Sequence, residues 1–318
     1  MKSPTLSNSL RLWSSAVLCL SLVSSEAATA YVTRSGSTWT GRVDGRTVYT
    51  GTSYNAAIQA CSDNMTSGTI YIRNSGTCDA TYGVSPRDGL TLDYGGTQSQ
   101  GQSGTISVIQ LDRKNNITIR NQRITGSPRY GIWSRSSNNL TLSGCSCDVS
   151  GGLIYRFDDS KGGGSRNINI NSLTANGPTA HGCETYTVDG FYWSTVTANN
   201  SAGCGLLLNN TVNWSGSSVY AYNCNYGGGY AGFRVANSNQ RGTVNYVDAN
   251  RCGRGIFSLT QSRDATVNNC YIRNCSGIGI WLQDSYNTHV RAGTVQGNAG
   301  GCYSITGGSG NSVTVNCQ

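Results

Sequence analysis

The sequence predicts an all-β solenoid, in which the chain winds into stacked coils of short strands. A glycine followed by an apolar residue recurs from Gly131 to Gly279, at spacings of 21, 30, 23, 27, 23 and 24 residues. Repeats of about 20 to 50 residues indicate stacked units that bury their apolar faces only against one another. Each unit contains two short β-rich runs separated by an Asn, Asp or Gly turn, and no helix recurs.

The start of the chain predicts a secretory signal peptide. Met1 and Lys2 precede an apolar run from about Leu12 to Val23, and small residues follow at 27–30. This order is typical of a cleaved leader and not of a membrane span. We therefore expect residues 1–30 to be removed, the mature protein to be extracellular, and no contact with membranes.

Cysteines and sequons fit a secreted protein. Removal of Cys19 leaves twelve of the thirteen cysteines, an even number that suggests disulfide bonds. Cys61 with Cys78 and Cys302 with Cys317 are plausible local pairs, and the other pairings stay open. Because paired C-x-x-C spacing is missing, we expect no zinc site. Seven N-x-Ser/Thr sequons predict a glycoprotein, at Asn64, Asn116, Asn139, Asn199, Asn209, Asn213 and Asn274.

The charge of the chain is sparse and arginine-rich. Charged residues make up 12% of the sequence, and the formal net charge is +8. After the leader only Lys114 and Lys161 remain as lysines, so arginine supplies almost all the positive charge. The guanidinium fork suits carboxylate, sulfate or phosphate, although a solvated basic surface is the simpler interpretation. No basic run is interleaved with aromatic residues, so we do not expect nucleic acid as a partner.

The N-terminal elements differ from the repeat. Residues 31–49 alternate polar and β-branched residues like a pair of edge strands. Residues 54–61 are the best helix candidate, with Thr52 or Ser53 as N-cap. A solenoid needs a plug over the open end of its core, and this helix fits that position. Residues 69–72, 90–92 and 106–111 predict the first, irregular coils.

From Lys114 onwards the predicted turns become regular. Asn or Asp precedes an alternating run at residues 115–119, 138–142, 166–170, 264–267 and 311–315. Asparagine tolerates left-handed backbone angles and bonds its own main chain, so it can stack at a tight corner. Coiling then forms parallel sheets with like residues stacked about 4.8 Å apart.

The helix candidate, the 21- to 30-residue repeats and the Asn-type turns together resemble the right-handed parallel β-helix proteins of the pectate-lyase-like superfamily. The resemblance covers about residues 50–317 and implies one right-handed parallel β-helix domain over residues 31–318. It leaves the activity open, because this superfamily includes lyases, hydrolases, epimerases and non-enzymes. In its calcium-dependent lyases an aspartate cluster holds Ca²⁺. The outward positions of this chain contain no such cluster, so we expect no cofactor, with Ca²⁺ left open as the one alternative.

Strand alternation predicts which side chains face solvent. With the repeat glycine as position zero, position one is apolar and faces inward, whereas positions two and four face outward. In the second repeat, position two is Ile154 or, if the repeat slips by one residue, Tyr155. Aromatic residues beside a few polar groups commonly bind sugar rings, although a covering loop or partner chain could bury them instead. The expected substrate-binding residues are Trp133, Arg135, Tyr155, Asn209, Arg254, Phe257, Trp281 and Gln283.

Four residues of this face are the expected catalytic groups: His181, Glu184, Tyr186 and Arg234. A β-eliminating lyase needs a base, a cation that stabilises the enolate-like state, and an acid for the leaving oxygen. His181 or Tyr186 would act as base or acid, and Arg234 would neutralise the substrate carboxylate. A polysaccharide lyase or epimerase acting on an acidic, uronic-acid-containing polymer is therefore the first hypothesis.

Two alternatives stay open. A glycoside hydrolase needs two carboxylates, which could be Glu184 with Asp158 or Asp159. The pair Asp158-Asp159 followed by His181-Gly182 resembles motifs of polygalacturonases, but the count places the aspartates at positions six and seven, beyond the strand. Residues 160–165 predict a mobile flap or a solvated Gly-rich loop. The other alternative is a non-enzymatic protein that binds cell-wall carbohydrate. In each case we expect a monomer.

Overall fold

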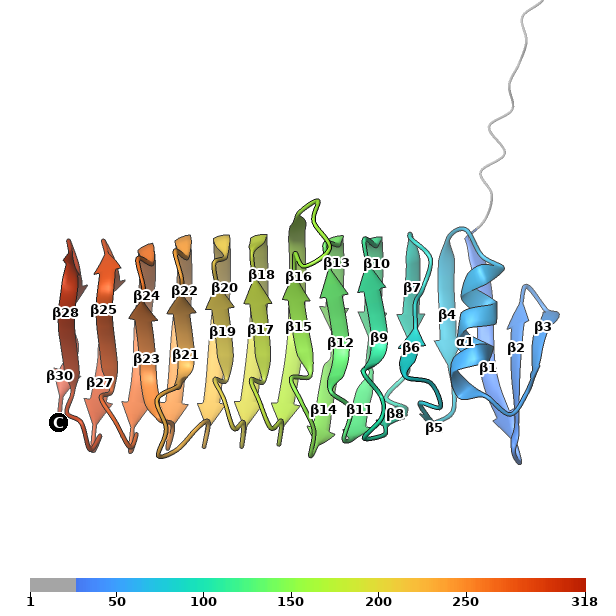
Figure 1. The fold of residues 1–318 in the computed structure, drawn as a ribbon, viewed down its shortest axis with the longest axis horizontal. Coiled ribbons are helices and arrows are strands. Elements are labelled where there is room, and N and C mark those ends of the chain that lie inside the picture. Colours follow the sequence, from blue (N-terminus) through green and yellow to red (C-terminus); the bar gives the residue numbers. More distant parts are fainter. Residues whose placement is uncertain (1–26) are drawn as a thin grey trace, which may run out of the picture.

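The protein is a parallel β-helix whose coils stack along one axis (Figure 1). The computed structural model describes residues 27–318, so residues 1–26 of the predicted signal peptide lie outside the described residues. The first strand starts at Ala28, inside the region expected to be cleaved. The all-β prediction is confirmed, because one short helix and thirty strands make up the described chain.

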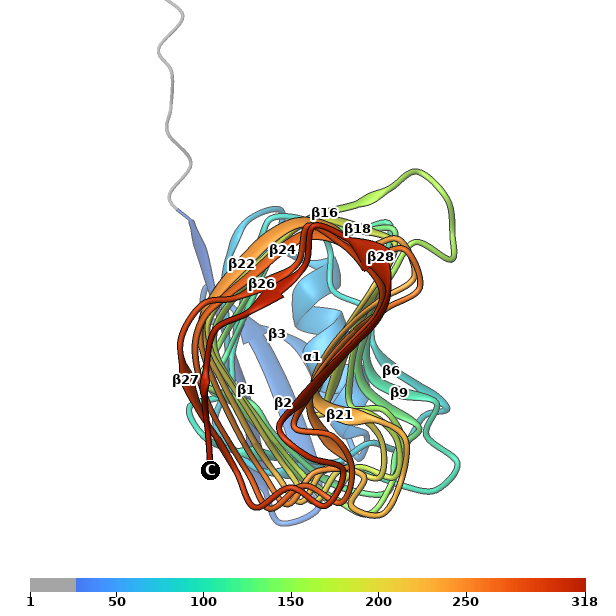
Figure 2. The same ribbon diagram turned by 90° about the vertical axis from the view of Figure 1, so that its left-hand side faces the viewer.

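Each coil has three sides, which superimpose when viewed along the axis (Figure 2). The first side contains β6 (Tyr82–Val84), β9 (Ser107–Asp112), β12 (Tyr130–Arg135), β15 (Tyr155–Asp158), β17 (Cys183–Tyr186), β19 (Leu206–Asn209), β21 (Ala231–Ala236), β23 (Arg254–Leu259), β25 (Ile280–Tyr286) and β28 (Tyr303–Ser309). Neighbouring strands on this side pair in parallel.

The second and third sides share five long strands in the middle of the solenoid: β16 (Ser165–Asn176), β18 (Val188–Asn199), β20 (Val212–Tyr222), β22 (Gln240–Asn250) and β24 (Arg263–Arg273). The other strands of the second side are β4 (Gly68–Ile72), β7 (Leu90–Asp93), β10 (Asn115–Arg120), β13 (Asn138–Ser143), β26 (His289–Val290) and β29 (Ser312–Val313). The other strands of the third side are β5 (Gly76–Thr77), β8 (Gln98–Gly101), β11 (Arg123–Gly126), β14 (Cys145–Val149), β27 (Gly293–Gln296) and β30 (Asn316–Cys317).

The core lies inside the coils and consists of stacked apolar columns. On the first side, Ile132 of β12, Leu206 of β19 and Phe233 of β21 point inward and are completely buried. On the second side, Leu142 and Ile170 pair in register and are equally inaccessible. Because each coil buries its apolar residues against the coils above and below, no single coil would be stable alone.

The N-terminal end is covered as the sequence predicts. β1 (Ala28–Ser35), β2 (Thr38–Val43) and β3 (Arg46–Gly51) form an antiparallel sheet. The predicted helix is α1 (Tyr54–Asp63), whose N-cap Ser53 accepts a hydrogen bond from the Ala56 N–H at 3.1 Å. The helix lies across the end of the core (Figures 1 and 2). Among residues 27–318, no helix is long and apolar enough to span a membrane.

The predicted asparagine turns are also confirmed. Asn116, Asn139 and Asn167 have positive φ angles between 54° and 58° at the same corner of successive coils. Their side chains stack, with Asn139 donating to Asn116 at 3.1 Å and Asn167 donating to Asn139 at 3.0 Å. These hydrogen bonds hold each corner to the one before it.

Of the two proposed disulfides, one is present. Cys302 and Cys317 are bonded, whereas Cys61 and Cys78 are free and buried. Cys61 extends from α1 towards the Arg42 carbonyl in β2, and Cys78 contacts the Ala80 carbonyl of its own turn. The predicted pairing of Cys61 with Cys78 is therefore wrong. Although the two cysteines are close in sequence, their side chains contact different parts of the structure.

Candidate functional site

The outward side of β9, β12, β15, β17, β19, β21, β23 and β25 carries two columns of side chains, and we call it the ladder face. Figure 1 views the molecule onto this face. Position two reads Gln110, Trp133, Arg156, Glu184, Leu207, Arg234, Phe257 and Trp281. Position four reads Asp112, Arg135, Asp158, Tyr186, Asn209, Ala236, Leu259 and Gln283. Glu184 and Arg234 thus share one column, with Leu207 between them.

The β15 coil departs from the expected count, and this corrects the assignment of Tyr155. The Gly131 N–H bonds to the Ile154 carbonyl, and Ile132 pairs with Tyr155. Ile154 therefore occupies the glycine position, so the repeat slips by two residues and not by one. Tyr155 is an inward residue with 0% exposure and cannot contact a substrate. Arg156 takes the outward position two in its place.

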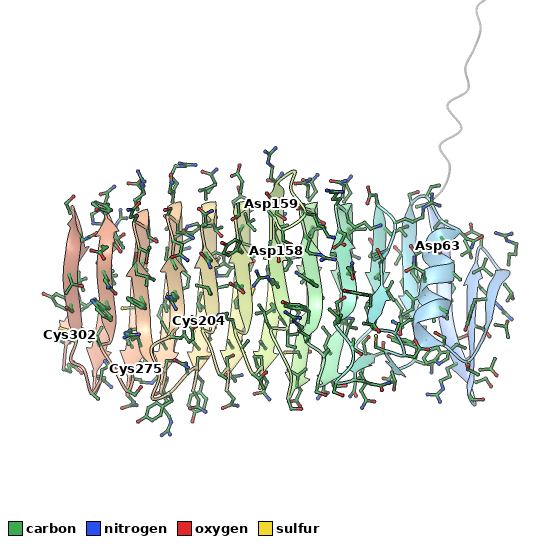
Figure 3. All side chains as sticks on the ribbon, in the orientation of Figure 1. Asp63, Asp158, Asp159, Cys204, Cys275 and Cys302 are labelled. Atoms are coloured by element: carbon green, nitrogen blue, oxygen red, sulfur yellow. A yellow bond between two sulfur atoms is a disulfide. The ribbon has the colours of Figure 1, made fainter. Side chains whose placement is uncertain are left out.

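The same slip moves Asp158 onto the ladder face. It is the last residue of β15, at position four, and not beyond the strand as the sequence count suggested. Figure 3 labels Asp158 and Asp159 on this coil. The Asp158 carboxylate is 1% exposed and accepts four hydrogen bonds. The donors are Trp133 Nε1 at 2.9 Å, Arg156 Nε at 2.7 Å, Ser160 N at 3.0 Å and Ser160 Oγ at 2.5 Å.

These contacts determine the charge state of Asp158. Burial alone would raise its pKa, but the hydrogen bonds from Ser160, Trp133 and Arg156 outweigh burial and lower the pKa below its ordinary value. Asp158 is therefore an anion whose acceptor positions are occupied. It fixes Trp133 and Arg156 and has little capacity left for a substrate.

Arg156 links Asp158 to Glu184. Its Nη1 lies 2.6 Å from Glu184 Oε2, while its Nε binds Asp158 on the other side. Glu184 is 6% exposed. Burial raises the pKa of Glu184 above its ordinary value, although Arg156 acts in the opposite direction. A buried carboxylate with a raised pKa is a stronger base than an exposed one, which suits proton transfer.

Arg135, an expected substrate ligand, is already paired. Its Nε and Nη2 bind the two oxygens of Asp112, both at 2.6 Å. The guanidinium also lies 4.0 Å from the centre of the Trp133 ring. Arg135 thus supports Trp133 and Asp112 rather than offering a free cation to the face.

His181 lies at the edge of the ladder face where β17 begins, one residue before Gly182. Its Nδ1 accepts a hydrogen bond from the Cys204 N–H at 2.8 Å, and its ring meets Tyr230 edge-on at 5.1 Å. Burial, with further contributions from Arg234 and Arg156, lowers the pKa of His181 to about 4. The ring is therefore neutral at pH 7, and its single proton is on Nε2. In this state His181 can donate a hydrogen bond, but Nε2 cannot accept a proton.

Arg234 and Arg254 form the cationic part of the face. Arg234 lies 5.0 Å from the Tyr230 ring and 5.3 Å from Phe257, and Arg254 lies 4.6 Å from Phe257 and 4.7 Å from Trp281. Within residues 27–318, neither guanidinium makes an ion pair, and Arg234 Nε is buried without a hydrogen-bond partner. Burial and the neighbouring Arg234 lower the pKa of Arg254. Two adjacent cations without acids would favour an anionic ligand.

The remaining expected residues lie near the Asp158–Arg156–Glu184 group or near the arginines Arg234 and Arg254. Tyr186 is 45% exposed, and its ring centre is 5.8 Å from the Arg156 guanidinium. Phe257 and Trp281 stack at 4.9 Å, with Phe257 covered by its neighbours and Trp281 half-buried. Asn209 accepts a hydrogen bond from Asn237 at 2.8 Å, and Gln283 lies half-buried at the C-terminal end of the column.

The loop at residues 159–165 packs against the preceding coil. Asp159 Oδ1 accepts hydrogen bonds from Ser136 Oγ at 2.8 Å and from Gly164 N at 2.9 Å. The Lys161 carbonyl accepts from Arg113 Nη2 at 2.7 Å. These bonds tie Asp159 to the corner of the coil, where it supports the loop.

Sequence reasoning missed two important residues. Counting from Gly152 as the repeat glycine puts Arg156 at position four, whereas strand pairing puts it at position two. The apolar pair Leu153-Ile154 before it is the sequence signal of this slip. Tyr230 precedes β21 in an irregular loop, where no period marks it, yet it contacts both His181 and Arg234.

Comparisons with known proteins agree with this architecture. A family model described as a right-handed β-helix region matches residues 162–318. Tailspike protein 2 of an Escherichia coli O157:H7 bacteriophage is similar over 83% of this chain, with a TM-score of 0.54 and 14% identity. The chain spans only 40% of that tailspike. The A-module of a mannuronan C-5 epimerase from Azotobacter vinelandii is similar over 84% of this chain and 93% of its own, with a TM-score of 0.50 and 15% identity.

No curated protein matches the sequence. At identities of 14% and 15%, the two solved structures show a shared fold alone. The repeat, the stacked parallel coils and the family model agree that this chain has a right-handed parallel β-helix fold.

Proposed function

We propose that the ladder face is the active site of a carbohydrate-active enzyme, a lyase or epimerase that removes the proton beside the carboxylate of a uronic-acid polymer. The observation that carries this proposal is the pair Arg234 and Arg254, two cations without acidic partners in the described chain, on the same face as the buried carboxylate of Glu184. The similarity of fold to a mannuronan C-5 epimerase is compatible with such a substrate.

Each group has a role in this chemistry. Arg234, supported by Arg254, binds the sugar carboxylate and stabilises the negative charge that develops when the neighbouring C–H bond breaks. Glu184 accepts that proton, because Arg156 holds it as a carboxylate while burial raises its basicity. Tyr186, exposed beside Arg156, donates the phenolic proton. His181 donates a hydrogen bond from Nε2 and positions the substrate.

The two reactions differ in the fate of the carbanion. In β-elimination its electron pair forms a carbon–carbon double bond, the glycosidic C–O bond breaks, and the leaving oxygen takes the Tyr186 proton. In epimerisation Glu184 keeps the proton that it removed, Tyr186 delivers its phenolic proton to the same carbon from the opposite face, and the polymer stays intact. The same residues therefore support either product.

A glycoside hydrolase based on Glu184 and Asp158 or Asp159 has less support. Arg156 lies between Glu184 and Asp158. Both oxygens of Asp158 and Oδ1 of Asp159 accept hydrogen bonds from the protein itself. A hydrolase needs a second carboxylate that faces the substrate or a water molecule.

The test is an assay of the purified chain against polygalacturonate, alginate and neutral polysaccharides. Ultraviolet absorbance detects unsaturated uronate ends, a reducing-end assay detects cleavage without unsaturation, and proton NMR detects epimerised units. We expect one acidic polymer to give an unsaturated or an epimerised product. Reducing ends without absorbance would establish hydrolysis, and the absence of all three signals would favour a binding protein.

Variants locate the chemistry. Glu184→Gln and Arg234→Ala should each lower the rate by about 100-fold or more, because one removes the base and the other the carboxylate ligand. Arg291→Ala is the matched control, since Arg291 is an exposed arginine near Asn268, outside the ladder face. Full activity in both ladder-face variants would refute this site, whatever the product is.

We also propose that the protein is secreted and acts extracellularly as a glycoprotein. The leader-like residues 1–30 and the sequons support this proposal. Expression in a secretory host, followed by N-terminal sequencing and mass measurement with and without glycosidase, tests it. An N-terminus at Met1, with no mass change, would contradict it.

A further inference from the structure

A hollow lies at the bend of the long strands, away from the ladder face. Its volume is about 310 Å³, and four successive coils line it: β16, β18, β20 and β22. Figure 2 shows β18 and β22 on a different side of the coil from β9 and β21. We call it the elbow hollow, lined by Asn169, Ile170, Asn171, Tyr192, Trp193, Ser194, Ser215, Gly216, Ser217, Thr243 and Asn245.

The lining of the elbow hollow is polar and uncharged. Hydroxyl and amide side chains dominate it, and no acidic or basic residue is part of the lining. β20 contributes only small residues to the lining: Ser215, Gly216 and Ser217. Hydroxyl and amide groups both donate and accept hydrogen bonds, so they match a ligand that carries many hydroxyls. The size lies at the lower end of the range for small-ligand sites, about 300–1,000 Å³.

Tyr192 supplies an aromatic surface in the elbow hollow, between Asn169 and Ser215 of the neighbouring coils. Its side chain is 38% exposed. The hydroxyl lies near the corner at Gly190, where an added Cβ would be 3.2 Å from it. Asn167 and Asn213 occupy this corner in the coils on either side, as the strand pairing shows. The asparagine stack is thus interrupted at Gly190, and the tyrosine hydroxyl takes the space.

The floor of the elbow hollow is the buried, hydrogen-bonded indole of Trp193. Trp193 is 4% exposed, and its Nε1 donates to the Ser218 carbonyl at 3.2 Å. Its indole lies directly beneath Gly216, where an added Cβ would be 1.8 Å from the ring. The site therefore does not have to be formed by the ligand, which limits the entropy cost of binding.

From these observations we infer that the elbow hollow is a second saccharide site, specific for an uncharged sugar. A sugar ring would lie against Tyr192, and its hydroxyls would bond to the serines and asparagines of the neighbouring coils. The ladder face, with two arginines that lack acidic partners in the described chain, is suited to acidic sugars, so the two faces would bind different parts of a mixed polysaccharide. This inference does not depend on the proposed activity.

Calorimetry with neutral oligosaccharides tests the inference, using glucan, xylan, mannan and galactan fragments and an oligogalacturonate for comparison. We expect a neutral fragment to bind. Tyr192→Ala should weaken that binding roughly tenfold, the loss expected for one aromatic contact. Ser215→Trp, a change at an exposed position, should abolish it by filling the hollow.

Two controls separate the alternatives. Tyr222 is an exposed tyrosine of β20 that does not line the hollow, so Tyr222→Ala should leave binding unchanged. Trp281→Ala alters only the ladder face and should also have no effect. No binding by any neutral fragment, or binding that survives both Tyr192→Ala and Ser215→Trp, would overturn the inference. Loss of neutral-sugar binding on Trp281→Ala would place that sugar on the ladder face and would overturn it equally.

Discussion

Arg156 connects the two buried carboxylates of the ladder face, Asp158 and Glu184. It bonds to a fully occupied carboxylate, Asp158, on its own strand and to Glu184 on the next. The two acids differ in their hydrogen bonding, and their pKa values are displaced in opposite directions. Such a difference between neighbouring carboxyl groups is typical of sites that transfer protons.

Asp158→Asn should destabilise the protein by about 3 kcal/mol, because the amide nitrogen cannot accept the hydrogen bonds that the buried carboxylate receives. Urea denaturation measures the change. Asp148→Asn is the matched control, since Asp148 is 57% exposed and lies 3.7 Å from Arg123, a pair that contributes little. Equal effects of the two substitutions would show that the Asp158 network does not stabilise the fold.

His181 should make stability depend on pH. Its pKa is about 4 in the folded protein and 6.5 in the unfolded chain, so the unfolded chain binds more protons between these values. The contribution of His181 is complete above pH 6.5 and is lost as the pH falls towards 4, by at most about 3 kcal/mol. Denaturation at pH 7 and pH 4.5 measures the loss. His181→Gln should show a smaller loss over this range, and an unchanged one would mean that other groups cause it.

At the scale of elements, the corners of the second side are stabilised by asparagines with positive φ. Asn139 illustrates both contributions, with a φ of 55° and a side chain that donates to Asn116 and accepts from Asn167. A left-handed backbone angle disfavours residues with a Cβ, and asparagine tolerates it better than most. The corner therefore combines a backbone requirement with a side-chain hydrogen bond.

Two substitutions separate these contributions. Asn139→Gly removes only the side-chain hydrogen bonds and should cost about 1 kcal/mol, whereas Asn139→Ala adds backbone strain and should cost about 1 kcal/mol more. Chemical denaturation of the two variants measures the difference. If alanine proves no more costly than glycine, the left-handed angle is not a significant constraint at this corner.

At the scale of the whole molecule, the solenoid is stabilised mainly between neighbouring coils, and its ends differ. α1 covers the N-terminal end, whereas at the C-terminal end of the described chain Tyr303 and Ile305 are 48% and 42% exposed. The disulfide Cys302–Cys317 closes this last coil over a separation of 15 residues. Each coil contacts mainly its neighbours, so damage to one end should stay local.

Cys302→Ser combined with Cys317→Ser should loosen the last coil by about 3 kcal/mol, the amount associated with closing a loop of this length. Amide hydrogen exchange should accelerate in β28, β29 and β30 while protection in β12 and β18 stays unchanged. Cys61→Ser is the control, because Cys61 is a free thiol at the other end. Faster exchange in the central coils would contradict the prediction that loss of the disulfide affects only the last coil.

The sequence alone determined the architecture of this protein. The spaced glycines, the alternating runs and the Asn corners are local signals repeated many times, so an error in one repeat does not alter the fold. They also placed Trp133, Glu184, Arg234, Phe257 and Trp281 in one outward column. Short-range patterns also predicted an N-cap at Thr52 or Ser53, where the structure has Ser53, and the Cys302–Cys317 disulfide, although the same argument failed for Cys61 and Cys78.

The chemistry of the ladder face depends on contacts between coils that the sequence does not reveal. The coil at Ile154 has no glycine at the corner, so its alignment is set by pairing with neighbouring coils, which turns Tyr155 inward and Arg156 outward. The neutral state of His181 depends on burial and on arginines that are distant in sequence. Side-chain alternation is a property of a single strand, whereas burial and charge pairing arise between coils, and that is why the sequence could predict one and not the other.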